Sequence, residues 1–188
     1  QIEEHVFNNC AGIRLAEGAD IGRIHSCTTA VADYADYLRE HIDADLTGLK
    51  VLFDCANGAS ANVAKQLFPA LGCECGFMGM EQDGVSVNDG CGSTHLEALE
   101  AAVKAGGYDC GIAFDGDADR CLGCDENGAE MDGDKIIALV GADMKERGRL
   151  DGNTAVVTVM SNLGFMKYME SIGIQTARTA VGDRYVLE

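Results

Sequence analysis

Residues 110–120 read Cys-Gly-Ile-Ala-Phe-Asp-Gly-Asp-Ala-Asp-Arg, an apolar run that leads directly into three closely spaced carboxylates. The apolar half, residues 110–114, is short and continuous, which is typical of a strand buried on both faces of a parallel sheet. The acidic half contains a glycine and predicts a loop at the carboxyl end of that strand. Ligands bind at such loops in doubly wound sheets. The stretch therefore predicts an α/β fold with a candidate site at one edge of its sheet.

Strand-like and helical patterns alternate on both sides of this stretch. Before it, two apolar or β-branched runs alternate with two amphipathic patterns, at residues 49–54, 60–71, 75–80 and 96–105. After it, the chain predicts a hairpin at residues 120–132 and an amphipathic helix at residues 134–147. Ser93 and Thr94 are expected to cap the helix that begins at Leu96. The alternation favours three-layer βαβ units around a mostly parallel mixed sheet.

The chain is expected to have three parts. Residues 1–27 are predicted to be a tail or linker from a preceding domain, and residues 28–149 a complete α/β domain. Residues 150–188 repeat the strand, helix and strand pattern but are too few for an ordinary domain, which needs about 50 residues or more. They predict an incomplete second α/β unit. Its apolar residues Val156, Val157 and Val159 would contact water unless the segment docks on the first domain or the chain self-associates.

The balance of charged residues excludes two classes of partner. The chain has 14 Lys and Arg against 31 Asp and Glu, a formal net charge of −17. Such a surface repels nucleic acid phosphates and anionic lipid headgroups. No apolar run approaches the roughly 18 to 20 residues of a membrane span, and no signal-peptide pattern opens the chain. We therefore expect a cytoplasmic protein with no nucleic acid or membrane partner.

The nine cysteines do not predict a disulfide framework, because their number is odd and several lie in strand-like runs. Reduced thiols in a cytoplasm fit this pattern better. The nearest approach to a zinc motif pairs Cys121 and Cys124 with Cys73 and Cys75. The spacing of the second pair is wrong for a zinc knuckle, and no His-rich segment accompanies it. Zinc is therefore disfavoured.

Asp115, Asp117 and Asp119 form the strongest chemical signal in the chain. Three clustered negative charges repel one another unless a positive group lies among them. A hard divalent cation with oxygen ligands meets that requirement, and three carboxylates that leave room for phosphate or water suit Mg²⁺. These three residues are therefore the predicted metal ligands.

Three other interpretations of the acidic loop remain open. With Glu126, its carboxylates occupy ligand positions of a helix-loop-helix calcium site, although Arg120 stands where that pattern needs glycine. Alternatively, Asp115 could be the nucleophile of a stand-alone metal-dependent aspartyl phosphatase, in which an apolar strand ends in Asp-x-Asp. The third interpretation is a solvated acidic turn without a ligand.

Six segments, in order along the chain, together resemble one known family. They are 54–59 (Asp-Cys-Ala-Asn-Gly-Ala), 87–95 (Val-Asn-Asp-Gly-Cys-Gly-Ser-Thr-His), 111–120, 131–134 (Met-Asp-Gly-Asp), 161–164 (Ser-Asn-Leu-Gly) and 180–188 (Ala-Val-Gly-Asp-Arg-Tyr-Val-Leu-Glu). The third looks like the metal-binding loop of the α-D-phosphohexomutases, and the others are similar to the phosphoglucosamine mutase branch of that family. The resemblance covers the chain from about residue 28 onward.

This resemblance implies a four-domain cytoplasmic isomerase that interconverts glucosamine 6-phosphate and glucosamine 1-phosphate through a phosphoserine and a sugar bisphosphate. By position, Asp115, Asp117 and Asp119 would hold Mg²⁺ together with a phosphoserine oxygen. Arg120 would lie beside the phosphoserine as a catalytic electrostatic partner. The resemblance also assigns a loop that faces the sugar phosphate to Gly182, Asp183 and Arg184.

The resemblance places essential parts of the enzyme outside these 188 residues. In the family, the phosphoserine loop belongs to the first domain and the phosphate-binding loop to the fourth. We therefore expect the chain alone to lack mutase activity, with the missing domains of the same polypeptide and a hexosamine phosphate as its partners. A phosphoglucomutase or phosphomannomutase of the same superfamily remains an alternative.

Overall fold

The computed structural model describes residues 2–187, which divide after Ala30 into two units. The first unit contains the short helix α1 (Ile2–Phe7) and the 3-10 helix η1 (Gly18–Asp20), and neither contains a buried residue. The second unit contains all the strands and the remaining helices within the described residues. Every candidate site residue therefore lies in the second unit.

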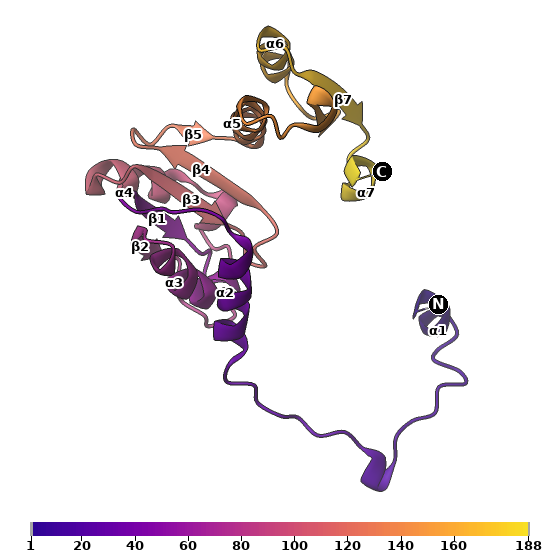
Figure 1. The fold of residues 1–188 in the computed structure, drawn as a ribbon. Helices are drawn as coiled ribbons and strands as arrows, with labels where there is room; N and C mark the ends of the chain where they lie inside the picture. The colour runs from indigo at the N-terminus through magenta and orange to yellow at the C-terminus, as the bar shows by residue number, and fades with distance from the viewer. Residues whose placement is uncertain (1, 188) are drawn as a thin grey trace. The chain divides into compact units, whose positions relative to one another are not determined.

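A five-stranded sheet forms the larger part of the second unit (Figure 1). In the order β2-β1-β3-β4-β5, its strands are Glu74–Met78, Lys50–Asp54, Cys110–Phe114, Cys121–Asp125 and Glu130–Met131. Strand β1 pairs in parallel with β2 and β3, while β4 and β5 continue the sheet in antiparallel pairs. The predicted α/β class and its mostly parallel mixed sheet are confirmed. Neighbouring parallel strands end at the same edge, and Asp54 at the end of β1 pairs with Ala113 of β3, so the loops that follow these two strands leave the same edge of the sheet.

Helices cover both faces of this sheet (Figure 1). Alternate residues of β1 point to opposite faces, so Phe53 packs with α3 (Ser60–Ala70) while Leu52 packs with α4 (Glu97–Gly106). The ring of Phe53 stacks on Phe68 of α3 at a centroid distance of 4.0 Å. On the α4 side, Leu99 and Val103 are fully buried. Helix α2 (Ala30–His41) lies beside α3 (Figure 1). This is the predicted three-layer arrangement.

The start of α4 differs from the prediction that Ser93 and Thr94 cap it. These residues belong to a 3-10 turn, η2 (Gly92–Thr94), and α4 begins after Leu96 without a side-chain cap. Gly92 adopts a positive φ of 76°, and its carbonyl accepts a hydrogen bond from the main-chain N–H of His95 at 3.0 Å. The tight turn leaves both hydroxyl-bearing residues upstream of the helix, so the capping prediction is wrong.

A second, two-stranded parallel sheet joins β6 (Thr154–Thr158) to β7 (Gln175–Thr179), with α6 (Leu163–Ser171) between them in the chain. The 3-10 helix η3 (Asp151–Asn153) precedes this sheet, and α7 (Asp183–Leu187) follows it. Its core contains five buried residues: Ala155, Val157, Phe165, Met169 and Ile174. The expectation that Val157 contacts water is therefore wrong, because α6 covers that face. Val156 and Val159, by contrast, are 41% and 53% exposed.

Helix α5 (Gly133–Glu146) packs against this second sheet unit. Ala138 contacts the buried cluster, and the Lys145 ammonium donates a hydrogen bond to the Gly173 carbonyl at 3.0 Å. Asp132 caps the start of α5 by accepting from the main-chain N–H of Lys135 at 2.8 Å. The domain limits expected at residues 27 and 149 stay predictions.

No helix within residues 2–187 combines the length and the apolar character that crossing a bilayer requires.

Candidate metal centre

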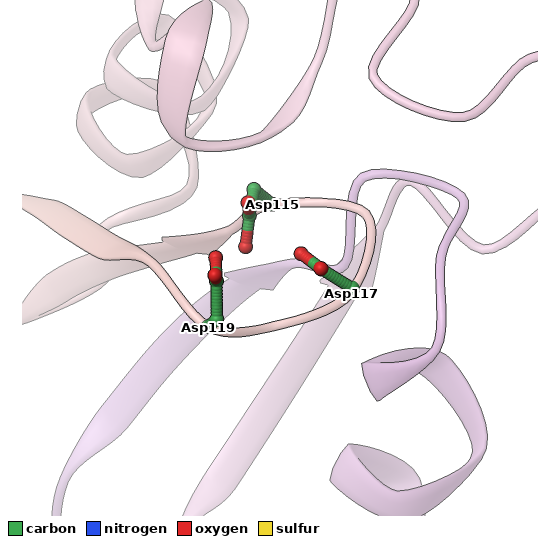
Figure 2. Close-up of side chains that lie close together, drawn as sticks. All are labelled: Asp115, Asp117 and Asp119. Carbon is green, nitrogen blue, oxygen red and sulfur yellow. The ribbon is translucent and has the colours of Figure 1, made fainter. Parts of the chain in front are cut away.

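Asp115, Asp117 and Asp119 converge at the carboxyl end of β3, in the loop that leads to β4 (Figure 2). Each offers one carboxylate oxygen, and the three oxygens lie within 4.8 Å of one another. Among the described residues, no other three His, Cys, Asp or Glu side chains come this close together. The tertiary structure therefore gathers the three residues that the sequence singled out.

Main-chain hydrogen bonds fold the loop into this shape. The N–H of Ala118 donates to the Asp115 carbonyl at 3.1 Å, and the N–H of Asp115 donates to the Arg120 carbonyl at 3.3 Å. Ala118 adopts a positive φ of 61°, a conformation that side-chain-bearing residues rarely occupy. The reversal it produces turns Asp117 and Asp119 back toward Asp115 (Figure 2).

Asp115 is the buried member of the group, with a side chain that is only 1% exposed. Its two oxygens accept from the main-chain N–H of Arg120 at 3.0 Å and from the Arg120 Nε at 2.8 Å. Burial raises the pKa of Asp115, but these hydrogen bonds outweigh it and bring the pKa down to about 2. Asp115 is therefore ionised at neutral pH.

Asp119 has the opposite shift. Its side chain is 70% exposed, yet its pKa is raised, first by the hydrogen-bonding proximity of the Asp115 carboxylate and then by the charge of Asp117. Asp115 in turn raises the pKa of the Arg120 guanidinium. One positive guanidinium does not neutralise three negative carboxylates. The repulsion that remains is what raises the pKa of Asp119.

The donor set fits a hard divalent cation. All three side chains offer carboxylate oxygens, which are the ligands that Mg²⁺ and Ca²⁺ prefer. Arg120, through its ion pairs with Asp115 at 2.8 Å and Asp119 at 3.5 Å, supplies one positive charge to three carboxylates, so the loop keeps excess negative charge. Each carboxylate oxygen of Asp115 accepts one hydrogen bond and retains a lone pair, so Arg120 does not prevent it from binding a metal.

Two neighbouring segments enclose the loop. The main-chain N–H of Ala59 donates to the Gly116 carbonyl at 2.8 Å, and Gly58 lies so close to this carbonyl that a Cβ atom would overlap it. A Cβ atom at Gly92 would lie 2.6 Å from the Phe114 carbonyl oxygen. Neither Gly58 nor Gly92 was predicted as a site residue from the sequence. For Gly58, the Asn57-Gly58 turn directly after a strand was a signal that could have indicated this position.

The residues predicted to face the sugar phosphate lie on a different sheet from the three aspartates. Gly182, Asp183 and Arg184 lie after β7 and at the start of α7, on the two-stranded sheet unit. Gly182 has a φ of 136°, and its carbonyl accepts from the N–H of Tyr185 at 3.0 Å. These residues form a helix start. Their predicted contact with the sugar phosphate stays a prediction.

The structure also bears on the calcium and zinc interpretations. Glu126 lies beyond β4, in the turn that leads to β5, where its side chain accepts from Asn127 at 3.0 Å. The calcium interpretation would require it to join the aspartates, which it does not do.

Cys121 and Cys124 lie three residues apart on β4 and so face opposite sides of the sheet. Burial raises the pKa of Cys124, which opposes the thiolate form that zinc requires.

Comparison with known protein sequences identifies relatives over the whole chain. Residues 32–128 match phosphoglucomutase/phosphomannomutase α/β/α domain II, and residues 132–188 match α/β/α domain III. The chain is 47% identical, over all 188 residues, to the phosphoglucosamine mutase of Acetivibrio thermocellus. It is 50% identical to that of Streptomyces avermitilis over 171 residues, which are 91% of the chain. The alignments cover 42% and 38% of these two relatives.

Solved structures show the same fold. A phosphoglucomutase/phosphomannomutase family protein from Burkholderia thailandensis superposes with a TM-score of 0.70 at 26% identity. The superposition covers 84% of this chain and 34% of that one. An N-acetylglucosamine-phosphate mutase of the α-D-phosphohexomutase superfamily shares the fold at a TM-score of 0.61 and 18% identity, over 84% of this chain and 33% of that one. The chain therefore belongs to the phosphoglucomutase/phosphomannomutase family.

Proposed function

We propose that this chain supplies the Mg²⁺-binding loop of a phosphoglucosamine mutase, a cytoplasmic isomerase that interconverts glucosamine 6-phosphate and glucosamine 1-phosphate. The observation that carries the proposal is the convergence of three carboxylates at the carboxyl end of β3. The relatives that are 47% and 50% identical are phosphoglucosamine mutases, which favours an aminosugar phosphate as substrate. The chain spans about two fifths of their length, so its activity belongs to a longer polypeptide.

In this proposal the chain's own residues position and neutralise charge. Asp115, Asp117 and Asp119 hold the cation, which supplies compensation for the negative charge of a transferring phosphoryl group. Arg120 holds Asp115 through its Nε and main-chain N–H, while its side chain remains 64% exposed. The guanidinium is paired through its Nε with Asp115 and Asp119, and its exposed outer face would attract a phosphate brought by another domain.

Gly182, Asp183 and Arg184 belong to the same proposal as residues that face the sugar phosphate. This part of the proposal rests on the resemblance of residues 180–188 to a family segment.

Turnover of glucosamine 6-phosphate tests the proposal in a polypeptide that carries this chain and extends to the length of its relatives. We expect Asp117→Asn to lower kcat by about a hundredfold or more, because it removes a ligand from the charge-compensating centre. The matched control is Glu126→Gln, which removes one negative charge at the far end of β4, away from the three aspartates. Equal turnover by the Asp117 variant and the parent would refute the metal assignment.

The 188-residue chain alone is expected to show no mutase turnover, because the proposed phosphoserine lies elsewhere in the polypeptide. Hydrolysis of a generic phosphomonoester in Mg²⁺ distinguishes this proposal from an aspartyl phosphatase. The two interpretations differ in the role of Asp115, which is a metal ligand in this proposal and the nucleophile in a phosphatase. Hydrolysis that disappears in Asp115→Asn would support the phosphatase instead.

A further inference from the structure

Asp54 is a buried carboxylate outside the candidate metal centre. It ends β1 and is fully buried, with no ion pair among the described residues. A buried carboxylate is costly unless hydrogen bonds compensate it. Its Oδ1 accepts from the main-chain N–H of Ala56 at 2.9 Å, and its Oδ2 accepts from the N–H of Gly92 at 2.8 Å. Asp54 therefore joins the turn that follows it to Gly92, which lies 38 residues further along the chain.

Its first partner begins the turn 56–59, which contacts the metal loop directly. Ala59 donates its N–H to the Gly116 carbonyl at 2.8 Å, and Gly58 lies against the same carbonyl. Gly116 separates Asp115 from Asp117, so its position sets the spacing of these two carboxylates.

Its second partner ends the segment 79–92, which contacts the metal loop from another direction. A Cβ atom at Gly92 would lie 2.6 Å from the Phe114 carbonyl oxygen, one residue before Asp115. A Cβ atom at Gly116 would lie 2.9 Å from the Asn88 side-chain nitrogen. Gly92 therefore packs directly against Phe114, and Gly116 packs directly against Asn88. Since neither pair leaves room for a Cβ atom, a shift of Gly92 or Asn88 would displace the loop.

The two segments are held in conformations that need support. Ala56, Asn57 and Asn88 have φ values of 52°, 54° and 60°, which are unfavourable for residues that carry a side chain. The Asn88 N–H donates to the Ala56 carbonyl at 3.0 Å, which ties the two strained positions together. The Asn57 side chain adds three hydrogen bonds. Its Nδ2 donates to the Ser86 carbonyl at 3.1 Å and to the Cys91 Sγ at 3.6 Å, and its Oδ1 accepts from the Glu81 N–H at 2.9 Å.

We infer that Asp54 is a positioning residue for the metal loop: by holding Ala56 and Gly92 together, it clamps both segments around Gly116. This inference rests on the proposed function of the loop. The Asp54 carboxylate accepts its hydrogen bonds from the main-chain N–H groups of Ala56 and Gly92. Its effect reaches the three aspartates through main-chain contacts on both sides of Asp115 and Gly116.

The test compares Asp54→Asn with Asp109→Asn in the 188-residue chain. Asparagine at 54 retains one oxygen but places an amide donor against a main-chain donor, so one of the two bonds is lost. Asp109 is a matched control, because its carboxylate accepts from the main-chain N–H of Lys50 at 2.7 Å at the opposite end of β1. Circular dichroism establishes that each variant is folded.

Two readouts follow in the folded variants. Without metal, we expect amide hydrogen exchange at Ala59 and Ala118 to be about tenfold faster, or more, in Asp54→Asn and unchanged in Asp109→Asn. On titration with MgCl₂, chemical shifts of the Gly116 and Ala118 amides should report an affinity about tenfold weaker, or more, in Asp54→Asn.

Wild-type exchange rates in a folded Asp54→Asn variant would overturn the inference. A wild-type chain whose loop amides do not respond to MgCl₂ would overturn the proposed metal site instead, while the exchange measurement still decides the role of Asp54. If Asp54→Asn does not fold, Asn57→Gly replaces it, because glycine accepts the positive φ while all three side-chain hydrogen bonds to segment 79–92 are lost. Faster exchange at Ala59 and Ala118 is then expected, and unchanged exchange would overturn the inference.

Discussion

Three chemically identical side chains in one loop have different electrostatic environments. Asp115 is buried against Arg120 and keeps a low pKa, whereas Asp119 is exposed and has a raised pKa because the other two carboxylates are near. Hydrogen bonds to the charged form outweigh the burial of Asp115, and repulsion outweighs the exposure of Asp119. The negative charge of Asp115 is therefore compensated by Arg120, whereas the negative charge of Asp119 is not compensated.

This difference predicts that Asp119→Asn affects the apo and metal-bound proteins in opposite directions. A carboxyl group whose folded pKa is raised reduces stability at pH values above its unfolded pKa, so removing the charge should raise the melting temperature in EDTA. In excess MgCl₂ the wild type should become the more stable protein, because it retains a third ligand. Thermal unfolding under both conditions checks this. A variant that melts below the wild type in EDTA would contradict the electrostatic argument, and Glu126→Gln controls for the charge change.

At the scale of elements, short-range hydrogen bonds shape the β4–β5 hairpin, whereas packing fixes α6. The Asp125 side chain accepts from the N–H groups of Asn127 at 2.9 Å and Ala129 at 2.8 Å, which closes the turn. Helix α6 instead buries Phe165 and Met169 against β6 and β7. The first element therefore depends on charge and the second on apolar burial.

The stability provided by Asp125 should depend on pH. The hydrogen bond from Ala129, followed by other contacts, lowers its folded pKa. The stabilisation is therefore complete above the unfolded pKa, which is about 3.9, and disappears as pH falls through the lower folded value. We expect the difference in unfolding free energy between wild type and Asp125→Ala to be largest at neutral pH and to shrink in acid. Urea unfolding across a pH series measures it, and a difference that stays constant would exclude this explanation.

Met169 should be the residue on which α6 most depends. Its side chain is fully buried, with a relative solvent exposure of 0%. Met169→Ala should cost about 2–5 kcal/mol of unfolding free energy, because it removes buried methylenes and leaves a cavity. Denaturant unfolding compares it with Tyr168→Ala, whose side chain is 46% exposed and should cost less. Equal losses of unfolding free energy in the two variants would mean that Met169 does not pack into the core of the two-stranded sheet unit.

At the scale of the whole molecule, net charge opposes compactness. A formal charge of −17 on 188 residues creates self-repulsion that no single ion pair relieves. The ion pairs within the described residues lie at the surface, apart from the one that Asp115 makes with Arg120. Surface pairs contribute little stability, so the sheet cores must outweigh the repulsion.

Salt should therefore stabilise the folded chain. Raising the NaCl concentration shortens the Debye length and screens like-charge repulsion, which predicts an increase in melting temperature. Choline chloride at the same ionic strength should have the same effect, because screening does not require a specific cation. A melting temperature that falls with both salts would show that attractive ion pairs outweigh the repulsion.

The acidic triplet and the alternation of strands and helices could be predicted because both depend on neighbouring residues. Residues 110–114 are apolar throughout and form β3, and the turn near Asn127 and Gly128 forms as expected. The capping role of Ser93 failed because a contact with Asp54, distant in the chain, shapes Gly92. Burial of Val157 was missed for a similar reason: periodicity indicates that a strand has an apolar face but not which helix covers it.

Local pattern thus established which elements form and which side chains could hold a cation, because hydrophobic period and charge spacing act over a few residues. Folding in three dimensions established what surrounds those side chains. Asp54 and Gly92 meet across 38 residues, and Gly58 meets Gly116, because parallel strands end at one edge of the sheet. No short window of the chain contains such pairs, so the support of the acidic loop follows from the fold alone.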